Sequence, residues 1–285
     1  MMLDEKYKEI RDMVKKFSDS EVAPRAMKID HEGHIPKELI AKLSENGFMG
    51  SYVPEEFGGA GLDYLSYSLL IEEISRNCAS TGVLISAHTS LAVWPILNFG
   101  TENQKKKYLP KMASGEWIGC FCLSEPNAGS DAGSITTFAE DKGDHWEING
   151  VKNWITNGKE AAICIVFAKT KKTPDYKGIS AFIVETSTPG FSIIKEEDKL
   201  GIRGSSTCQL AFDKVKVPKE ALLGEAEKGF RLAMATLDGG RIGIASQAWV
   251  LLKGLLITLF VTPNNVFNSV LHFLTYKGFS SCWPI

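Results

Sequence analysis

A loop near the middle of the chain has the composition of a ligand-binding loop. The segment Phe121–Ser134, FCLSEPNAGSDAGS, begins as a strand and then breaks at three residues that suit neither a strand nor a helix, Pro126, Asn127 and Gly129. Backbone N–H groups in such a loop point outward beside the hydroxyls of Ser124 and Ser130. They could hydrogen-bond a flat polar ring or a ligand that carries a thioester. An ordinary surface turn has the same composition, so other segments must decide.

A second segment could supply a flat surface for such a ligand. In Asn153–Asn157, NWITN, Trp154 and Thr156 stand two residues apart, so on a β-strand their side chains share one face. That face offers an aromatic plate with a hydroxyl donor beside it, which the isoalloxazine ring of a flavin needs. The alternative is that Trp154 belongs to a core and Thr156 satisfies a turn.

A third segment combines an acid and a base. Asp238 and Arg241 flank Gly239 and Gly240, and their i, i+3 spacing places both charges on one helix face. They could form a structural ion pair, or they could position a polar ligand at a cleft. A Rossmann or P-loop nucleotide site is not indicated, because neither glycine motif is present. No Ser-His-Asp arrangement can be argued from the spacing.

Cysteine and histidine spacing predicts neither a disulfide framework nor a zinc site. No two cysteines form a C-x-x-C pair and most lie in apolar contexts, so we expect reduced core thiols in an intracellular protein. His31 and His34 are i, i+3 neighbours, but no second ligand pair follows them. The six cysteines are Cys78, Cys120, Cys122, Cys164, Cys208 and Cys282.

We expect residues 1–118 to form an N-terminal helical domain. The i, i+3, i+4, i+7 pattern of a buried helix face occurs at Ile10, Met13, Val14 and Phe17. Pro36 and Asp63 are expected to begin two further helices, and Gly47 to end the first of these.

The segment Ser80–Phe99 contains no Asp, Glu, Lys or Arg and is predicted to be a core helix. Its many polar residues and Pro95 argue against a membrane span. The net charge of the 285 residues is −2, which provides no basic field for nucleic acid. The N-terminus resembles neither a signal nor a transit peptide, so we expect a cytoplasmic protein.

Short strands dominate residues 119–222, which we expect to form an antiparallel barrel or sandwich. Asn149-Gly150 is a hairpin signal between two such strands, and Asn157-Gly158 is a second turn. Further strands are expected at Ile163–Ala168, Ile179–Glu185, Phe191–Lys195 and Gln209–Val217. An all-α block before an all-β block is typical of an α+β multidomain chain.

Helical patterning returns in residues 223–248, where Gly239-Gly240 weakens the middle of one long predicted helix. The composition then changes. Residues 249–285 contain two charged side chains, Lys253 and Lys277, and no acid. We expect this tail to be no continuation of the preceding domain.

Taken together and in order, these segments resemble the acyl-CoA dehydrogenase family, most of all its short-chain (butyryl-CoA) branch. The motifs that carry the resemblance are SEPNAGSD, NWITNG, KGISAFIVE, DKLGIRGSST, LLGEAEKGF and TLDGGRIGIASQA. The resemblance runs almost continuously from about residue 5 to Ala248. It implies an N-terminal helical domain, a middle antiparallel β-barrel and the remnant of a C-terminal helical domain.

The resemblance also implies FAD as cofactor, a short-chain acyl-CoA as substrate and electron-transfer flavoprotein as electron acceptor, with no nucleic acid or membrane partner. The residues that match the family's FAD contacts are Phe121, Cys122, Leu123, Ser124, Glu125, Pro126, Asn127, Ala128, Gly129, Ser130, Trp154, Ile155 and Thr156. Those that match its acyl-CoA contacts are Ser130, Asp238, Gly239, Gly240 and Arg241.

The chain departs from the family where catalysis needs a base. In the family a glutamate removes the α-proton of the thioester as the β-hydride passes to the flavin. No Asp or Glu follows Asp238, and Gly240 stands where some relatives place the base. We therefore assign no catalytic residue and expect impaired activity.

We therefore expect residues 1–248 to be a C-terminally truncated family member, followed by an unrelated tail. A frameshifted or misassembled reading frame would produce such a chain. The family homotetramer is not expected, because its core is built largely from helices that the match does not include. Two alternatives remain open. One is a non-catalytic fold remnant, which binds FAD or CoA weakly or acts as an interaction protein. The other is a related flavin oxidase or nitroalkane-type enzyme.

Overall fold

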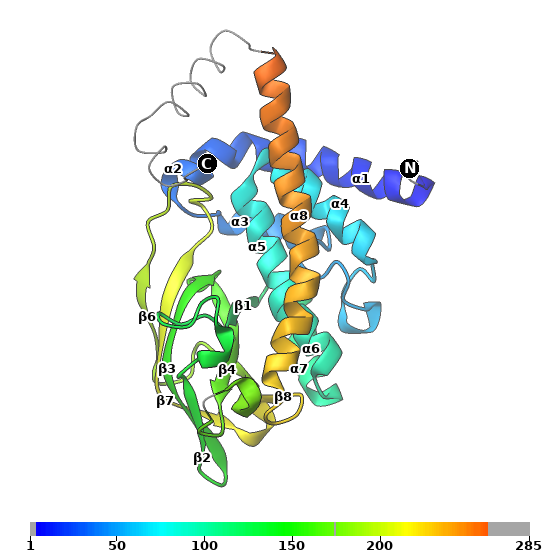
Figure 1. Cartoon of the computed structure of the whole chain (residues 1–285). Helices are drawn as coiled ribbons and strands as arrows, with labels where there is room; N and C mark the ends of the chain where they lie inside the picture. Colours follow the sequence, from blue (N-terminus) through cyan, green and yellow to red (C-terminus); the bar gives the residue numbers. More distant parts are fainter. Residues whose placement is uncertain (1–3, 174, 262–285) are drawn as a thin grey trace, which may run out of the picture.

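The computed structural model describes residues 4–173 and 175–261, which form a layer of helices packed against a twisted β-sheet (Figure 1). The α-helices are α1 (Glu5–Phe17), α2 (Ala26–Glu32), α3 (Lys37–Glu45), α4 (Tyr64–Asn77), α5 (Ala79–Ser86), α6 (Trp94–Phe99), α7 (Glu102–Ala113) and α8 (Gly229–Val261). Shorter helical segments are η1 (Ser18–Val22), η2 (Ala23–Arg25), η3 (Glu55–Phe57), η4 (Ala87–Val93), η5 (Ala132–Ser134), η6 (Tyr176–Gly178) and η7 (Lys219–Ala221).

The predicted helix starts are confirmed. Pro36 precedes α3, and Asp63 caps α4 by accepting a hydrogen bond from the Ser66 backbone N–H at 2.8 Å. The apolar face of α1 is confirmed for Val14 and Phe17, which are buried. It is wrong for Met13, which is 49% exposed.

The charge-free segment 79–99 is a core element of the helical layer. Ala79–Phe99 is apolar and long enough to qualify as a membrane span by length and composition alone, yet 67% of its apolar window is buried inside this fold. The segment consists of α5, the π-helical η4 and α6, which follow one another in continuous helical conformation, and Pro95 is the second residue of α6. Because proline has no N–H to donate to the preceding turn, the helical hydrogen bonding is interrupted here, directly after the π-helical turns of η4.

Eight strands form one sheet, in the order β6-β7-β3-β2-β4-β5-β8, with β1 paired to β4. The strands are β1 (Ile118–Cys122), β2 (Phe138–Asp141), β3 (His145–Thr156), β4 (Ala161–Lys169), β5 (Ile179–Glu185), β6 (Phe191–Glu196), β7 (Thr207–Pro218) and β8 (Leu222–Leu223). The four strands expected between residues 163 and 217 are confirmed as β4, β5, β6 and β7.

The predicted antiparallel barrel is corrected in two respects. Among the described residues no pairing joins β6 to β8, the two ends of the order, so the sheet is not closed. The strand β8 has only two residues, too few to support closure. The pairs β1–β4 and β2–β4 are parallel, which needs a long crossover that strand spacing does not reveal.

The predicted hairpin at Asn149-Gly150 is wrong. The strand β3 runs unbroken through it, and its pairing with β7 shifts register between Ile148 and Gly150. Gly150 instead forms a bulge at φ 156°, where an added Cβ would lie 2.3 Å from the Thr137 Oγ1. The turn predicted at Asn157-Gly158 is confirmed between β3 and β4.

Strand β4 is buried on both faces, which explains its continuous apolar run. Ile163, Ile165 and Phe167 pack toward the helices, in a core shared with η4, α6, α7 and α8. The alternating residues Cys164 and Val166 pack in a second core formed by the inner face of the sheet.

The long helix α8 lies across α4, α5 and η4 and joins the helical layer to β5 (Figure 1). It runs without a break through Gly239-Gly240 and past residue 248 to Val261. Its later turns expose apolar side chains, among them Trp249 at 58% and Leu252 at 50%. Residues 262–285, the larger part of the expected tail, lie outside the described residues.

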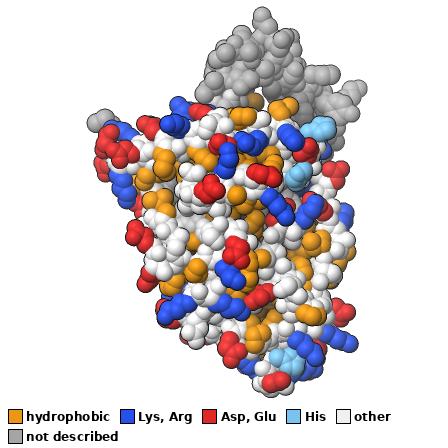
Figure 2. Space-filling model, turned by 180° about the vertical axis from the view of Figure 1, so that it is seen from behind, with side chains coloured by type: hydrophobic (Ala, Val, Ile, Leu, Met, Phe, Trp, Pro, Cys, Tyr) orange, Lys and Arg blue, Asp and Glu red, His pale blue; other side chains and the backbone are white. Residues whose placement is uncertain are grey.

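The surface carries charges of both signs. On the face opposite to that of Figure 1, acidic and basic side chains alternate between small apolar areas (Figure 2). This distribution follows from the near balance of 32 Lys and Arg against 34 Asp and Glu.

Candidate functional site

A cavity of about 350 Å³ lies where the helical layer meets the sheet. Its walls come from η4, from the loop after β1, from the end of β3 and from α8, so the three segments singled out in the sequence meet here. The lining residues are Ala87, Leu91, Phe121, Leu123, Ser124, Gly129, Ser130, Ala132, Trp154, Ile155, Thr156, Met234, Leu237 and Arg241.

Several predicted site residues do not line this cavity. They are Cys122, Glu125, Pro126, Asn127, Ala128, Asp238, Gly239 and Gly240. Five lining residues were not predicted, namely Ala87, Leu91, Ala132, Met234 and Leu237. Most of these could have been found from helical spacing: Met234, Leu237 and Arg241 recur at i, i+3 and i+7 on α8, and Ala87 and Leu91 are i, i+4 neighbours in η4.

A buried ion pair holds the loop in place. The Lys152 ammonium, which is fully buried, donates to the Glu125 Oε1 at 2.8 Å and to the Leu123 carbonyl at 3.0 Å. Glu125 also accepts hydrogen bonds from the backbone N–H groups of Thr136 and Thr137, at 2.6 and 3.0 Å. The loop is therefore tied at both ends to β3 and to the segment before β2.

The environment of Glu125 keeps its carboxylate charged. Burial alone would raise its pKa, but the charge and hydrogen bond of Lys152, together with bonds from Thr137 and Thr136, outweigh burial and lower the pKa to about 2. Burial lowers the pKa of Lys152, and Glu125 opposes that shift. Glu125 faces the interior of the fold rather than the cavity, so it organises the loop.

The end of β3 presents Trp154 to the cavity. Trp154 adopts a left-handed backbone conformation at φ 60° and is 61% exposed, so it is not a core residue of the sheet. The pairing of β3 with β7 shifts register between Lys152 and Ile155, which permits this conformation. The Asn153 N–H donates to the Ser124 carbonyl at 2.9 Å and fastens the strand to the loop. A strained aromatic residue at a cavity is a common feature of ligand sites.

Hydroxyl groups on these walls are available to a ligand. Within residues 4–173 and 175–261, the hydroxyls of Ser124, Ser130 and Thr156 make no hydrogen bond, and all three residues line the cavity. Trp154 and Thr156 both line the cavity, and Ile155 between them lines it as well, so strand alternation does not set this arrangement. An aromatic ring with free hydroxyl groups beside it fits a flat polar ring such as a flavin.

The charged pair on the α8 wall is exposed. Asp238 and Arg241 form an ion pair whose side chains are 72% and 69% exposed, which is the structural pairing considered above. Arg241 also lines the cavity, whereas Asp238 does not. Gly240 lies against the same wall, because an added Cβ would be 2.8 Å from the Leu91 Cδ2.

The cavity walls carry no acid. Among the described residues that line the cavity there is no Asp or Glu, and Arg241 is the one charged side chain. The arrangement can bind a flat ring and orient a polar group. A general base for proton removal is not part of the walls that these residues form.

His88 was not singled out from the sequence, yet it joins the two layers. The Gly119 N–H donates to its Nδ1 at 3.0 Å, so Nε2 carries the hydrogen and donates to the Met112 carbonyl at 3.1 Å. Complete burial lowers its pKa to about 4, although hydrogen bonds to backbone carbonyls oppose the shift. The neutral ring bridges η4, α7 and β1, behind the cavity.

A larger hollow, of about 1130 Å³, lies between α2, α3 and the turn after β3. Charges of both signs line it, including Lys37, Glu38, Lys159 and Glu160, and none of the three predicted segments reaches it. The smaller cavity is therefore the better candidate site.

Known proteins show the same order of elements. A family described as "Acyl-CoA dehydrogenase, N-terminal domain" matches residues 4–116, and one described as "Acyl-CoA dehydrogenase, middle domain" matches residues 120–215. The mitochondrial short-chain specific acyl-CoA dehydrogenase of Rattus norvegicus is 51% identical over 246 residues, which are 86% of this chain and 60% of that protein.

Solved structures agree with this match. Butyryl-CoA dehydrogenase from Megasphaera elsdenii superposes with a TM-score of 0.88 at 44% identity, over 91% of this chain and 69% of that one. A glutaryl-CoA dehydrogenase from Mycobacterium smegmatis in complex with FADH2 gives 0.84 at 33% identity, over 91% and 65%.

The chain belongs to the acyl-CoA dehydrogenase family. It spans about 60% of the length of the curated short-chain relative from rat.

Proposed function

We propose that this chain contributes to FAD-dependent α,β-dehydrogenation of a short-chain acyl-CoA thioester. The observation that carries the proposal is the meeting of the Phe121–Ser130 loop, the Trp154–Thr156 strand end and Arg241 around one cavity. The similarity to the short-chain relative from rat supports the short-chain substrate class. We also propose that electron-transfer flavoprotein accepts the electrons from the reduced flavin.

The described residues fit a flavin ring. Trp154 would supply an apolar plate, and the hydroxyls of Ser130 and Thr156 would hydrogen-bond the polar edge of the ring. The bound flavin would supply the hydride acceptor. The Lys152–Glu125 pair would keep the loop in its binding geometry before the ligand arrives, which lowers the cost of ordering the loop.

We further propose that this polypeptide on its own removes the α-proton of the substrate slowly. The support is the absence of a carboxylate among the described residues that line the cavity. A second candidate function, binding of FAD or CoA without turnover, is favoured by the same observation. Under both candidate functions the purified protein binds flavin and is yellow. They differ in whether added substrate reduces the bound flavin.

A carboxylate restored at Gly240 tests the first candidate. The Gly240→Glu variant would place its side chain against Leu91, whose flexible end can move aside. We expect this variant to reduce its flavin faster than the unchanged chain when butyryl-CoA is added without oxygen. The matched Gly240→Gln variant should not, because an amide cannot take the proton. Equal rates in all three proteins would contradict the missing-base proposal.

A further inference from the structure

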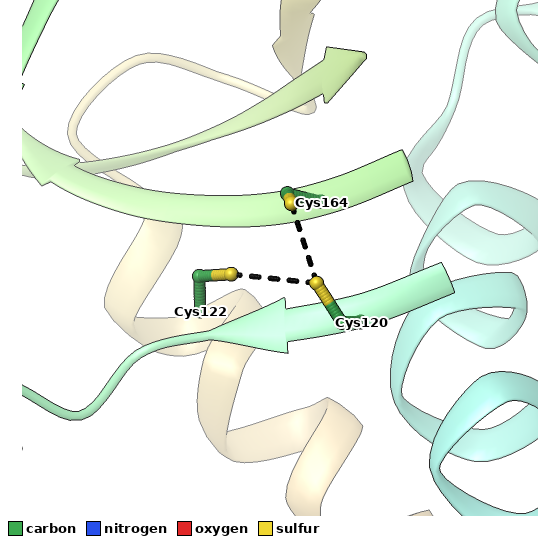
Figure 3. Close-up of side chains that lie close together, drawn as sticks. All are labelled: Cys120, Cys122 and Cys164. Atoms are coloured by element: carbon green, nitrogen blue, oxygen red, sulfur yellow. Dashed lines mark hydrogen bonds between the residues drawn. The ribbon is translucent and has the colours of Figure 1, made fainter. Parts of the chain in front are cut away.

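Three cysteines that are separated in sequence meet in the inner core of the sheet. Cys120 and Cys122 lie on β1 and point to the same side, and Cys164 lies opposite Cys120 on the neighbouring strand β4 (Figure 3). The Cys120 sulfur is 3.3 Å from that of Cys164 and 3.6 Å from that of Cys122. All three Sγ atoms lie within 4.8 Å of one another, and all three residues are fully buried.

This spacing suits three sulfurs bound to one central atom. A metal–thiolate bond of about 2.3 Å at tetrahedral angles separates neighbouring sulfurs by a little under 4 Å. The three thiols approach from two strands whose pairing fixes them, so little rearrangement is needed. Soft thiolate ligands select soft, thiophilic centres.

The charge balance of the core decides which centre fits. The charge of Lys152, which acts on Cys122, is already neutralised by its buried ion pair with Glu125. A divalent zinc or cadmium ion with three thiolates would add one uncompensated negative charge to a fully buried site, which is costly. A trivalent centre bound by three thiolates is neutral and adds none.

We propose that Cys120, Cys122 and Cys164 form a binding site for a trivalent thiophilic metalloid, taken up as arsenous acid, As(OH)₃. Three As–O bonds break and three As–S bonds form. Each thiol proton leaves with one hydroxide as water, so three waters are released and no electron is transferred. The reactant and the product are both neutral, as the dry core requires.

Access to the thiols comes from local opening of the first strand. Among the described strands β1 pairs with β4 alone, whereas β4 also pairs with β5 and β2. A strand with one neighbour has fewer ladder hydrogen bonds to break than the central strands, but β1 is also packed against η4 and bonded to His88, so uptake should be slow and limited by this opening. Once bound, the metalloid links β1 to β4 and stabilises the fold.

The chain offers a matched control for this site. Cys208 is also fully buried in the same core, but it is not one of the three clustered thiols. Cys282, which lies outside the described residues, is removed by Cys282→Ser in every protein tested. The readouts are arsenic bound per chain after removal of free arsenite, and the shift in melting temperature.

We expect one arsenic per chain and a higher melting temperature in arsenite. Each of Cys120→Ala, Cys122→Ala and Cys164→Ala should weaken binding by at least about tenfold, because one of three bonds is lost. Cys208→Ala should bind as the parent does. If one variant fails to fold, the other two still test the site.

The proposal would be overturned if the parent retained no arsenic. It would also be overturned if Cys208→Ala lost as much arsenic binding as the three cluster variants, or if zinc bound more tightly than arsenite in competition. None of these readouts requires bound flavin, so the result does not depend on the proposed dehydrogenase activity.

Discussion

The two walls of the cavity carry ion pairs of opposite kinds. On the loop side, Lys152 and Glu125 are buried, and the Glu125 carboxylate also accepts hydrogen bonds from the backbone N–H groups of Thr136 and Thr137. On the α8 side, Asp238 and Arg241 are mostly exposed, and apolar side chains continue along the helix beyond them. Buried, fully bonded groups fix a wall tightly, whereas an exposed pair on a helix adds little. The loop wall is therefore fixed by a buried ion pair, whereas the α8 wall is held by the packing of α8 against α4, α5 and η4, and its exposed ion pair adds little.

The largest expected effect comes from breaking the buried pair. Lys152→Met would leave the Glu125 carboxylate buried without its partner, and we expect a loss of about 3–5 kcal/mol in unfolding free energy. Urea denaturation measures it. The control is Lys159→Met, which removes an exposed pair with Glu196 and should cost below about 1 kcal/mol. Similar losses in both variants would contradict the contrast between buried and exposed ion pairs.

The pH dependence of stability reports on the junction between the layers. The pKa of His88 falls from 6.5 to about 4 on folding, so the folded state binds fewer protons than the unfolded state between these values. This contribution is therefore complete above pH 6.5 and is lost as the pH falls to 4, by about 3 kcal/mol. Urea titrations at pH 7, 6, 5 and 4 would show it.

The variant His88→Gln separates this histidine from other groups. Its amide cannot become charged, so the slope between pH 6.5 and 4 should flatten. Glu125, whose pKa is lowered to about 2, stabilises the fold above pH 4.5, and its contribution is lost only as the pH falls from 4.5 toward 2. An unchanged slope in His88→Gln would show that another group is responsible.

How far the sequence predicted these regions depends on whether the signal is local. The Asp63 cap, the four strands from β4 to β7 and the turn at Asn157-Gly158 follow from short-range chemistry and were predicted. The hairpin at Asn149-Gly150 was wrong, because a bulge against β7 uses the same residues. Open edges and parallel pairing depend on contacts between distant segments, which no local pattern encodes.

The same limit applies to the site. The sequence and its family resemblance pointed to the loop, Trp154 and Arg241, which line one cavity in the structure. They did not reveal that Lys152 is buried against Glu125, since a lysine on a strand is ordinarily a surface residue. The meeting of Cys164 with Cys120 also required the parallel β1–β4 pairing.

Trp154 should matter for ligand binding and little for stability. Its side chain is 61% exposed, so Trp154→Ala should change the unfolding free energy by no more than about 0.5 kcal/mol. The flavin content per chain should nevertheless fall severalfold, because the plate against the ring is lost. Trp154→Phe keeps an aromatic ring at this position and should retain more flavin than Trp154→Ala. A large loss of stability in Trp154→Ala would instead place the residue in the core.

The smallest effect is expected at the exposed pair on α8. Asp238→Asn removes the partner of Arg241, and we expect a change below about 0.5 kcal/mol in thermal or urea unfolding. A loss comparable with that of Lys152→Met would contradict the contrast between the buried and the exposed ion pair.

The most direct test of the central claim is the visible spectrum of the purified chain with added FAD, before and after anaerobic addition of butyryl-CoA. The account predicts that flavin stays with the protein through gel filtration and that butyryl-CoA bleaches it slowly or not at all. A protein that remains colourless would contradict the flavin site at the loop and Trp154. Rapid bleaching would contradict the proposal that the cavity lacks its base.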